Sequence, residues 1–386
     1  MAVDITDPRL PVAPGAAARA PLIDLAAASL AAPTPSRAEE IDRALTAALA
    51  ERLASGQALL LADTLAAAPS VAIARQLWRR LIDAWALASR PDSGAGVAAA
   101  LFALPVVLVA GSPEGADGAA PPELSGRLSD TERLAAILRE ERALGGSQTF
   151  GFAPALVAAD AIDVAQLSAL LAWQKLDHGA HSSVRDLPPA PISVQPGVQG
   201  VHLRFLIGTA LVAAQADPFA AAGSGWAMPF ARELARELAV PGLSVLALPR
   251  PPASPPAALQ HGRAAQREVG AQLFASNAIR KLRAQVGEPA AVISAHRATS
   301  APGGGELRLS LSSPFDPRQA EGFRCPLFPT DRAGDVATML VELLADCRVA
   351  DVRILPGVHA DRDPQTGLTL LFKADAVTAA AQASLH

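Results

Sequence analysis

Several residue types are scarce in this chain of 386 residues, and each scarcity excludes a class of protein. The sequence has no tyrosine, three lysines, a single asparagine (Asn277) and two cysteines (Cys325 and Cys347). Two cysteines cannot form a disulfide framework for a chain this long, and no CxxC pair indicates a zinc or redox site. We therefore expect a reduced, cytoplasmic protein.

The chain also lacks an excess of one charge and a long hydrophobic run. Lysine and arginine number 33 against 37 aspartates and glutamates, a net charge of −4, so no global basic field attracts nucleic acid or an anionic membrane. The longest apolar run, residues 97–111, contains Pro105 and is shorter than the roughly 20 residues of a membrane span. The N-terminal sequence MAVDITDPRLPV has no basic segment before an apolar one, unlike a secretory signal. We expect no membrane partner.

The sequence motifs for cofactor binding and catalysis are either incomplete or wrongly placed relative to the predicted strands. None of the three lysines follows the GxxxxG of a phosphate-binding loop. Residues 94–99 match a relaxed GxGxxA pattern, but they precede a predicted strand, whereas a dinucleotide-binding turn follows one. Gly223-Ser224-Gly225 lacks the outer glycines of a GxSxG nucleophile turn. We expect no cofactor, and an enzyme is the less favoured class.

Hydrophobic residues make up 51% of the chain, enough for a substantial core. Residues 1–35 are rich in alanine and proline with weak periodicity, which predicts a flexible leader; its Leu22, Ile23 and Leu25 could dock on a partner. Residues 36–90 form a helical region, in which Ser36 and Glu39 match a capping box and a second helix begins near Ser70.

Residues 91–248 alternate apolar runs with helical patterns and predict a central α/β domain. Three similar runs contain Phe102, Phe150 and Phe205 at matching positions. They predict either a repeated strand–helix unit or simply three central strands with similar packing demands. Five prolines within residues 249–256 predict a linker and the clearest domain boundary.

Residues 257–386 predict an α+β domain. The expected elements are a long helix, strands and an amphipathic helix from Asp331, with the ranges 257–286, 289–298, 306–312, 323–328, 352–355 and 368–372. With residues 243–248 as its first strand, the order resembles a split βαβ, ferredoxin-like fold. The predicted fold class is thus α+β: an N-terminal helical region, a central α/β layer and a ferredoxin-like C-terminal domain.

A basic segment at residues 265–298 is the first candidate binding site. It collects rare residue types, and its cations repeat at helical spacing. Such a patch would bind a phosphate, an acidic protein or RNA, although the flanking strands have no aromatic side chain to stack bases. A solvated helix face is the alternative reading. The candidate residues are Arg267, Asn277, Arg280, Lys281, Arg283, His296 and Arg297.

A second candidate is a metal site at Asp177, His178 and His181. Imidazole and carboxylate groups both ligate Zn²⁺, and His202 or Asp186 would complete the set if the following proline-rich segment folds back. A polar loop after a helix is the alternative.

The succession FLIGTALVA, AQREVGAQLFASNAIRKL and GEPAAVISAHRA, followed by an amphipathic helix and a closing strand, resembles a family of uncharacterised bacterial proteins of similar length. The similarity covers the C-terminal half. It implies no activity and transfers no catalytic residue.

Three functional hypotheses follow from the sequence. The first is a non-catalytic cytoplasmic binding, assembly or regulatory protein with a protein partner or self-association. The second is an enzyme with an unrecognised, metal-assisted site near Asp177, His178 and His181. The third is binding of an anionic ligand or RNA through residues 267–297, with nucleic acid the less favoured partner.

Overall fold

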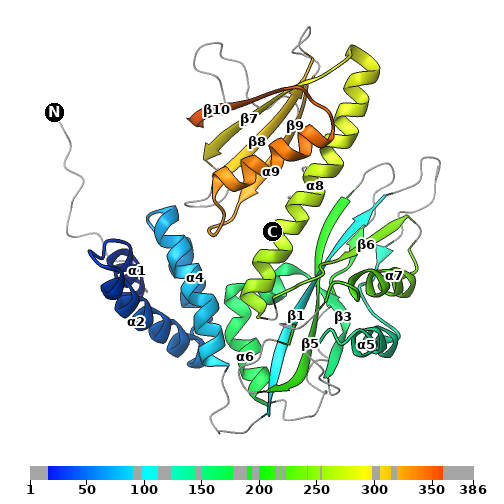
Figure 1. The fold of residues 1–386 in the computed structure, drawn as a ribbon. Coiled ribbons are helices and arrows are strands. Elements are labelled where there is room, and N and C mark those ends of the chain that lie inside the picture. Colours follow the sequence, from blue (N-terminus) through cyan, green and yellow to red (C-terminus); the bar gives the residue numbers. More distant parts are fainter. Residues whose placement is uncertain are drawn as a thin grey trace, which may run out of the picture.

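The structure is a computed structural model of the full chain, in which helices and strands are arranged around two main sheets (Figure 1). The residues that it describes are 16–89, 97–111, 123–144, 150–176, 189–193, 200–213, 218–219, 223–240, 242–252, 254–297, 305–313 and 320–359.

Four helices form the N-terminal part: α1 (Ala16–Leu30), α2 (Pro35–Ala54), α3 (Ala58–Ala66) and α4 (Val71–Ala88). Thr34 and Ser70 cap α2 and α4, because their hydroxyl groups accept backbone N–H groups of the first turn. The predicted flexible leader is wrong for α1, whose Leu22 and Ala26 are buried against α2 and α4. Alanine has the highest helix propensity but buries little area, so this helix has almost no amphipathic signal.

The central sheet has the strand order β3-β5-β1-β6 and is antiparallel throughout. Its strands are β1 (Val97–Ala110), β3 (Phe150–Val157), β5 (Gly200–Ala213) and β6 (Leu243–Ala247). The three similar runs are thus three adjacent strands. Pro105 lies inside β1, and β6 pairs with β1 only from Val106 onward. A proline has no N–H to donate, which accounts for the end of the ladder at this point.

Helices cover both faces of the central sheet. On one face Phe102 and Leu104 of β1 pack with α5 (Thr131–Glu140) and α7 (Ala227–Leu238). On the other face Leu101, Ala103 and Val107 pack with α6 (Leu167–Leu176), the N-terminal helices and the first part of α8 (Pro255–Val286). Two short strands, β2 (Glu123–Leu124) and β4 (Ile192–Ser193), and two 3-10 turns, η1 (Ala159–Ile162) and η2 (Val164–Gln166), complete this part.

The helix α8 belongs to both halves of the molecule (Figure 1). Its Ala258 and Leu259 lie in the core of the central sheet, whereas Ala271, Ala275 and Ile279 lie in the core of the C-terminal sheet. The helix approaches the central sheet closely at Gly262, where a β-carbon would lie 2.8 Å from Leu203 Cδ1.

The proline-rich residues 249–256 are therefore not the spacer that the sequence predicts. Pro255 and Pro256 occupy the first turn of α8, where the missing N–H groups are not needed by the helix. The two cores meet along α8 itself.

The C-terminal sheet has the strand order β10-β7-β8-β9. Its elements are β7 (Ala290–Arg297), β8 (Gly305–Ser312), β9 (Ala320–Leu327), α9 (Ala333–Asp346) and β10 (Asp351–His359). β7, β8 and β9 form an antiparallel meander, and β10 pairs parallel to β7. The second half of α8 and α9 pack on a single face, against alternate residues such as Ile293 and Leu309. The predicted α+β class is confirmed.

One strand of that prediction is wrong. Residues 243–247 pair with β1 in the central sheet and not with the C-terminal sheet. A five-residue apolar strand carries no local information on which sheet it joins. The ferredoxin-like pattern was counted from this strand and is not confirmed, and the predicted strand 368–372 lies outside the described residues. Among the described residues, no helix is long and apolar enough to cross a membrane.

Candidate functional site

The predicted basic residues on α8 mostly have partners within the chain. Arg267 is 7% exposed and pairs with Asp331, and it also donates to the carbonyl of Pro326 at 3.0 Å. Its guanidinium lies over the ring of Phe328, 5.3 Å from the centroid. Arg75 of α4 donates to the backbone carbonyls of Pro329 and Asp331 from the other side. We call Arg75, Arg267, Phe328 and Asp331 the latch, because they tie α4, α8 and the β9–α9 connection together.

The remaining α8 residues lie further along the helix. Lys281 pairs with Glu321, and Arg283 donates to Glu288 at 2.9 Å. Arg283 also donates to the carbonyls of Cys347 and Arg348, both at 3.1 Å, and so satisfies the end of α9.

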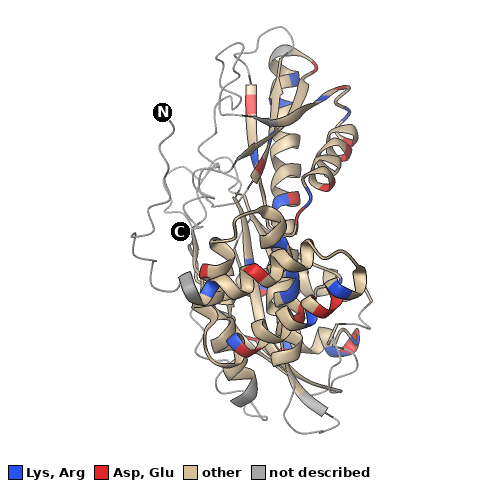
Figure 2. Cartoon of the chain, turned by 90° about the vertical axis from the view of Figure 1, so that its left-hand side faces the viewer, with Lys and Arg blue, Asp and Glu red and all other residues tan. Residues whose placement is uncertain are grey.

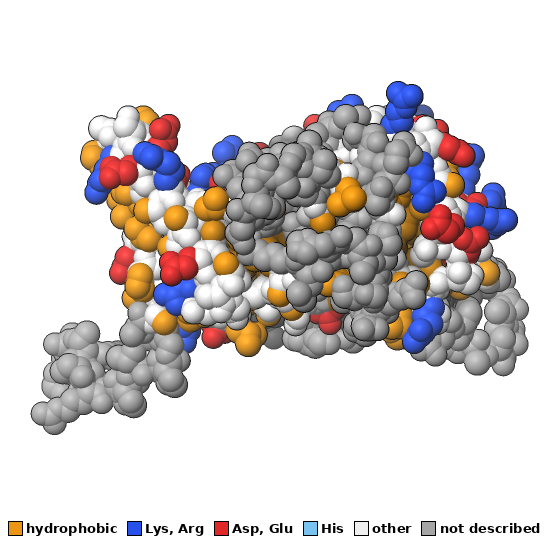
Figure 3. Space-filling model, turned by 90° about the horizontal axis from the view of Figure 1, so that it is seen from below, with side chains coloured by type: hydrophobic (Ala, Val, Ile, Leu, Met, Phe, Trp, Pro, Cys, Tyr) orange, Lys and Arg blue, Asp and Glu red, His pale blue; other side chains and the backbone are white. Residues whose placement is uncertain are grey.

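Asn277 accepts a hydrogen bond from Arg280 at 3.0 Å, and both residues are exposed. Residues of both charges alternate along the described chain in Figure 2, and side chains of both charges lie near one another on the face that Figure 3 shows. The described part of the chain therefore does not gather these cations into one open patch, and ligand binding there stays a prediction.

His296 does not lie with the α8 cations. It projects from β7 on the face opposite α8 and α9, where its Nε2 is 2.7 Å from Ser294 Oγ. The side chain of Arg297 lies outside the described residues.

The face that holds His296 is polar, and we call it the polar face. Register places Ser294 opposite Arg308, His296 opposite Glu306, and Arg308 opposite Arg324. These side chains are nonetheless largely buried: Arg308 and Ser294 are 2% exposed, and Glu306 is 9% exposed. The members of the polar face are Ser294, His296, Glu306, Arg308, Ser310 and Arg324.

Charge pairing on the polar face is uneven. Arg308 donates through Nε to Glu306 Oε1 at 2.6 Å, a buried ion pair. Arg324 lies directly opposite Arg308, and like charges opposite one another destabilise a strand pair. The buried Nε of Arg324 makes no hydrogen bond. The polar face thus holds Arg308 and Arg324 opposite each other beside the carboxylate of Glu306, and its outer strand β10 adds the exposed pair Arg353 and Asp351.

Ser294, His296 and Glu306 have the residue types of a nucleophile, base and acid set, but their setting does not fit acyl transfer. Such chemistry needs free N–H donors beside the nucleophile to stabilise an oxyanion. Ser294 lies within an unbroken ladder between β7 and β8, which engages the backbone of both strands. The arrangement holds and orients charge, and within the described residues it provides no oxyanion site.

The sequence signal for the polar face was incomplete. The alternation of Leu307, Leu309 and Leu311 predicts a half-buried β8 and hence a polar face with Glu306 and Arg308. Nothing in that alternation indicates that the polar side is buried as well, so the sequence alone does not predict Glu306 and Arg308 as site residues.

The predicted metal ligands Asp177, His178 and His181 lie outside the described residues, as does Asp186. Among the residues that are described, no group of three histidines, cysteines or acidic residues is placed to hold a metal ion. His202 lies on β5, where burial, and then the positive charge of Arg204, lower its pKa to about 4. The imidazole of His202 is therefore neutral at pH 7.

The sheet edges differ in how they are protected against pairing with another strand. β3 contains Pro154 and a register shift, and its outer side is bonded to residues 126–128. β10 contains the exposed Arg353, Pro356 and a register shift. β9 contains Glu321, Arg324 and Pro326. Charges, prolines and bulges are among the devices by which sheets block unwanted pairing.

β6 has none of these devices. It contains no charge and no proline, its register with β1 is unbroken, and no other described strand pairs with its outer edge. Ser244 is exposed and Leu246 is 43% exposed, on the sheet face to which Val107 of β1 belongs. We call Leu243–Ala247 the open edge.

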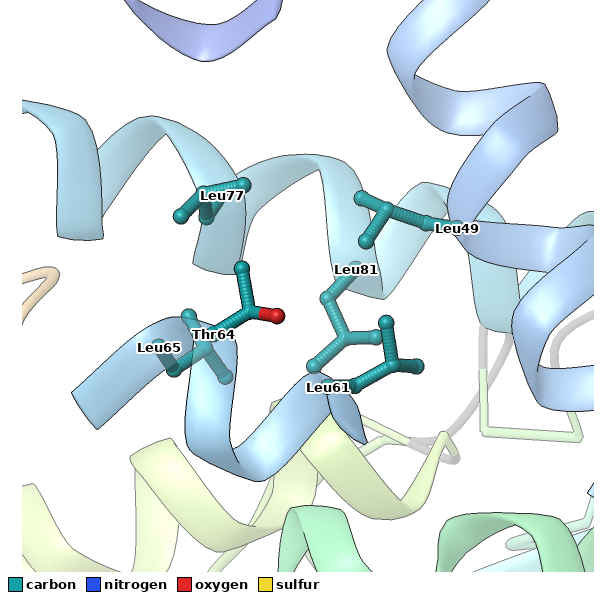
Figure 4. Close-up of a pocket in the computed structure, with 6 residues that line it drawn as sticks. All are labelled: Leu49, Leu61, Thr64, Leu65, Leu77 and Leu81. Atoms are coloured by element: carbon teal, nitrogen blue, oxygen red, sulfur yellow. The ribbon is translucent and has the colours of Figure 1, made fainter. Parts of the chain in front are cut away.

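A small cavity lies among α2, α3 and α4, lined by leucines and Thr64 (Figure 4). Its volume is about 10 Å³, at the lower limit for one water molecule. The hydroxyl of Thr64 donates to the carbonyl of Leu60 at 2.6 Å, and the other lining residues are leucines. The cavity is a packing defect of the helical region and not a ligand site.

Comparisons of the chain with protein-family models, with curated proteins and with solved structures found no match. The resemblance to an uncharacterised bacterial family therefore stays a prediction.

Proposed function

We propose that this protein is a non-catalytic binding or assembly protein of the cytoplasm, and that it engages a protein partner by strand pairing at the open edge. The observation that carries the proposal is the contrast among the sheet edges. β3, β9 and β10 carry prolines, charges or bulges, whereas Leu243–Ala247 carries none.

Physical chemistry supports strand addition at this edge. Alternate residues of an edge strand direct N–H and C=O groups away from the sheet, and a second strand satisfies them through a regular ladder. The exposed Leu246 offers a side chain that an added strand would cover. Water satisfies the edge in the free protein, so the gain on pairing comes from the ladder together with this apolar burial.

The other readings have less support. The α8 cations of the anionic-ligand hypothesis mostly have partners within the chain, and the metal hypothesis rests on residues outside the described part. A ferredoxin-like assignment of residues 257–386 stays a prediction and carries no part of this proposal.

Affinity capture with a matched pair of variants tests the proposal. Leu246→Lys places on the open edge the charge that natural edges use for protection. Leu59→Lys makes the same change on the helix α3, at a leucine that is 71% exposed. We expect wild type and Leu59→Lys to capture the same partner, and Leu246→Lys to lose at least about tenfold of it. Equal capture by Leu246→Lys, with the fold intact by circular dichroism, would refute binding at the open edge.

A further inference from the structure

We infer that the strand that pairs with the open edge is the open edge of a second copy of this chain, so that two central sheets join into one about a twofold axis. The inference rests on the proposed function and adds the identity of the partner.

The sequence of the open edge suits pairing with itself. In an antiparallel pair with the twofold axis at Val245, this residue lies opposite its own copy. Ser244 then lies opposite Leu246, and Leu243 lies opposite Ala247, in both halves of the pair. Because Leu243–Ala247 contains no charged residue, no like charges meet at any position of this register.

Side-chain placement on the two faces also suits this arrangement. Ser244 and Leu246 are exposed on one face, and they are the residues that would be paired across the axis. The two copies of Leu246 would be diagonal neighbours, a separation within reach of long side chains. On the other face Leu243 and Val245 are half-buried and pack in the core that contains α7, which supports the strand from behind.

The wider sheet allows the extension. β6 ends the order β3-β5-β1-β6, so pairing with a copy continues the sheet to eight strands with β3 at both outer ends. β3 is the protected edge, with Pro154 and the bonded segment 126–128. A twofold dimer therefore uses the open edges and leaves protected ones outside, which closes the assembly at two chains.

Five residues from each chain form a short interface, of the small and transient class. We therefore expect a dimer that dissociates on dilution. Sedimentation equilibrium across a wide range of protein concentration is the first measurement, with Leu246→Lys expected to stay monomeric and Leu59→Lys expected to behave as wild type.

A disulfide trap tests the register in the full chain. Val245→Cys places a thiol opposite its own copy at the axis, within the Cα separation that a disulfide needs. Ser244→Cys is the matched control, because its opposite residue is Leu246. Cys347 is replaced by serine in both variants, whereas Cys325 is kept because it is 0% exposed and burial raises its pKa to about 12.

Under mild oxidation we expect several-fold more covalent dimer from Val245→Cys than from Ser244→Cys. A chain that is monomeric at every concentration, together with equal cross-linking of the two variants, would overturn the inference. If capture of a different protein still depended on Leu246, the proposed function would survive and only the second copy would be excluded. If no Leu246-dependent capture remained either, both would fail.

Discussion

The central sheet and the C-terminal sheet each have four strands, but they differ in what lies on their faces. Helices cover both faces of the central sheet, and the residues of β1 that point to either side are apolar, such as Ala103 and Leu104. In the C-terminal sheet α8 and α9 cover one apolar face, and the other is the polar face. Both kinds of face are buried at their centres, since Leu104 is 0% exposed and Arg308 is 2% exposed.

This difference separates two ways of stabilising a sheet. An apolar face gains free energy from each side chain that leaves water, largely without regard to its neighbour's identity. A buried charge must be paired to offset the hydration that it loses, so the contribution of Arg308 to the polar face depends on its ion pair with Glu306. On the polar face, the contribution of one side chain to the free energy of unfolding should therefore depend on whether its charged partner is present. In the central sheet, the contributions of individual side chains should be independent.

The largest expected effect tests this dependence directly. Replacing Arg308 by methionine leaves the carboxylate of Glu306 buried without its described partner, and we expect a loss of about 3–5 kcal/mol in the free energy of unfolding. Replacing both residues, Arg308→Met with Glu306→Leu, should recover more than half of that loss. Urea denaturation of the two variants and of wild type measures both quantities.

The central sheet supplies the control. Leu104→Ala should cost about 2–5 kcal/mol. Ile207→Val, on the opposite face of the same sheet, should add its own smaller cost without rescue. Additive losses in both sheets, with no recovery in the Arg308 and Glu306 pair, would show that the two sheets are stabilised alike.

A second prediction concerns the helix that joins the sheets. Arg267→Ala removes the ion pair with Asp331 and the contact with Phe328, and we expect a loss of about 1–3 kcal/mol. Arg280→Ala on the same helix removes only an exposed hydrogen bond to Asn277 and should change stability by less than about 0.5 kcal/mol.

Hydrogen exchange locates the effect of the latch. We expect faster exchange in β9 and α9 of the Arg267→Ala variant, and unchanged exchange in β1 and β5, because the latch holds the C-terminal sheet to α4 and α8. Uniformly faster exchange in both sheets would mean that α8 makes them a single cooperative unit.

Much of the fold could be predicted from local patterns. The strands β7 and β8 and the helix α9 lie close to their predicted ranges, because alternation and helical periodicity act over a few residues. The start of α4, which Ser70 caps, also follows from the local sequence. Local patterns do not show which sheet a segment joins or which cores a helix contributes to. Leu243–Ala247 pairs with the central sheet, and Pro255 begins a helix that contributes to both cores.

The candidate site was less predictable for a related reason. The identity of His296 is visible in the sequence, but its position on the face opposite α8 follows from register with β8. The open edge exists because no described strand pairs with the outer side of β6. No local pattern of Leu243–Ala247 predicts this order of strands. The sequence identifies Arg267 as a cation, but it does not identify its partner Asp331, which lies 64 residues away in the chain.

The smallest expected effect is a pH dependence to which His202 of the central sheet contributes. The pKa of His202 falls from 6.5 to about 4 on folding, because burial and then Arg204 disfavour the imidazolium. Between those values the unfolded chain binds more protons than the folded one. Stability is therefore complete above pH 6.5 and decreases as the pH falls toward 4.

The imidazole of His202 is half-buried, and water screens part of its interaction with Arg204, so the loss should be smaller than the two effects above. His202→Gln should reduce the difference in unfolding free energy between pH 7 and pH 5. It should not abolish the difference, because burial also lowers the pKa of His261. At pH 5 the protection of the β5 amides against hydrogen exchange, relative to an unfolded chain at the same pH, should fall more than that of the β8 amides. The same slope in His202→Gln as in wild type, or an equal loss of protection in both strands, would place the titration outside the central sheet.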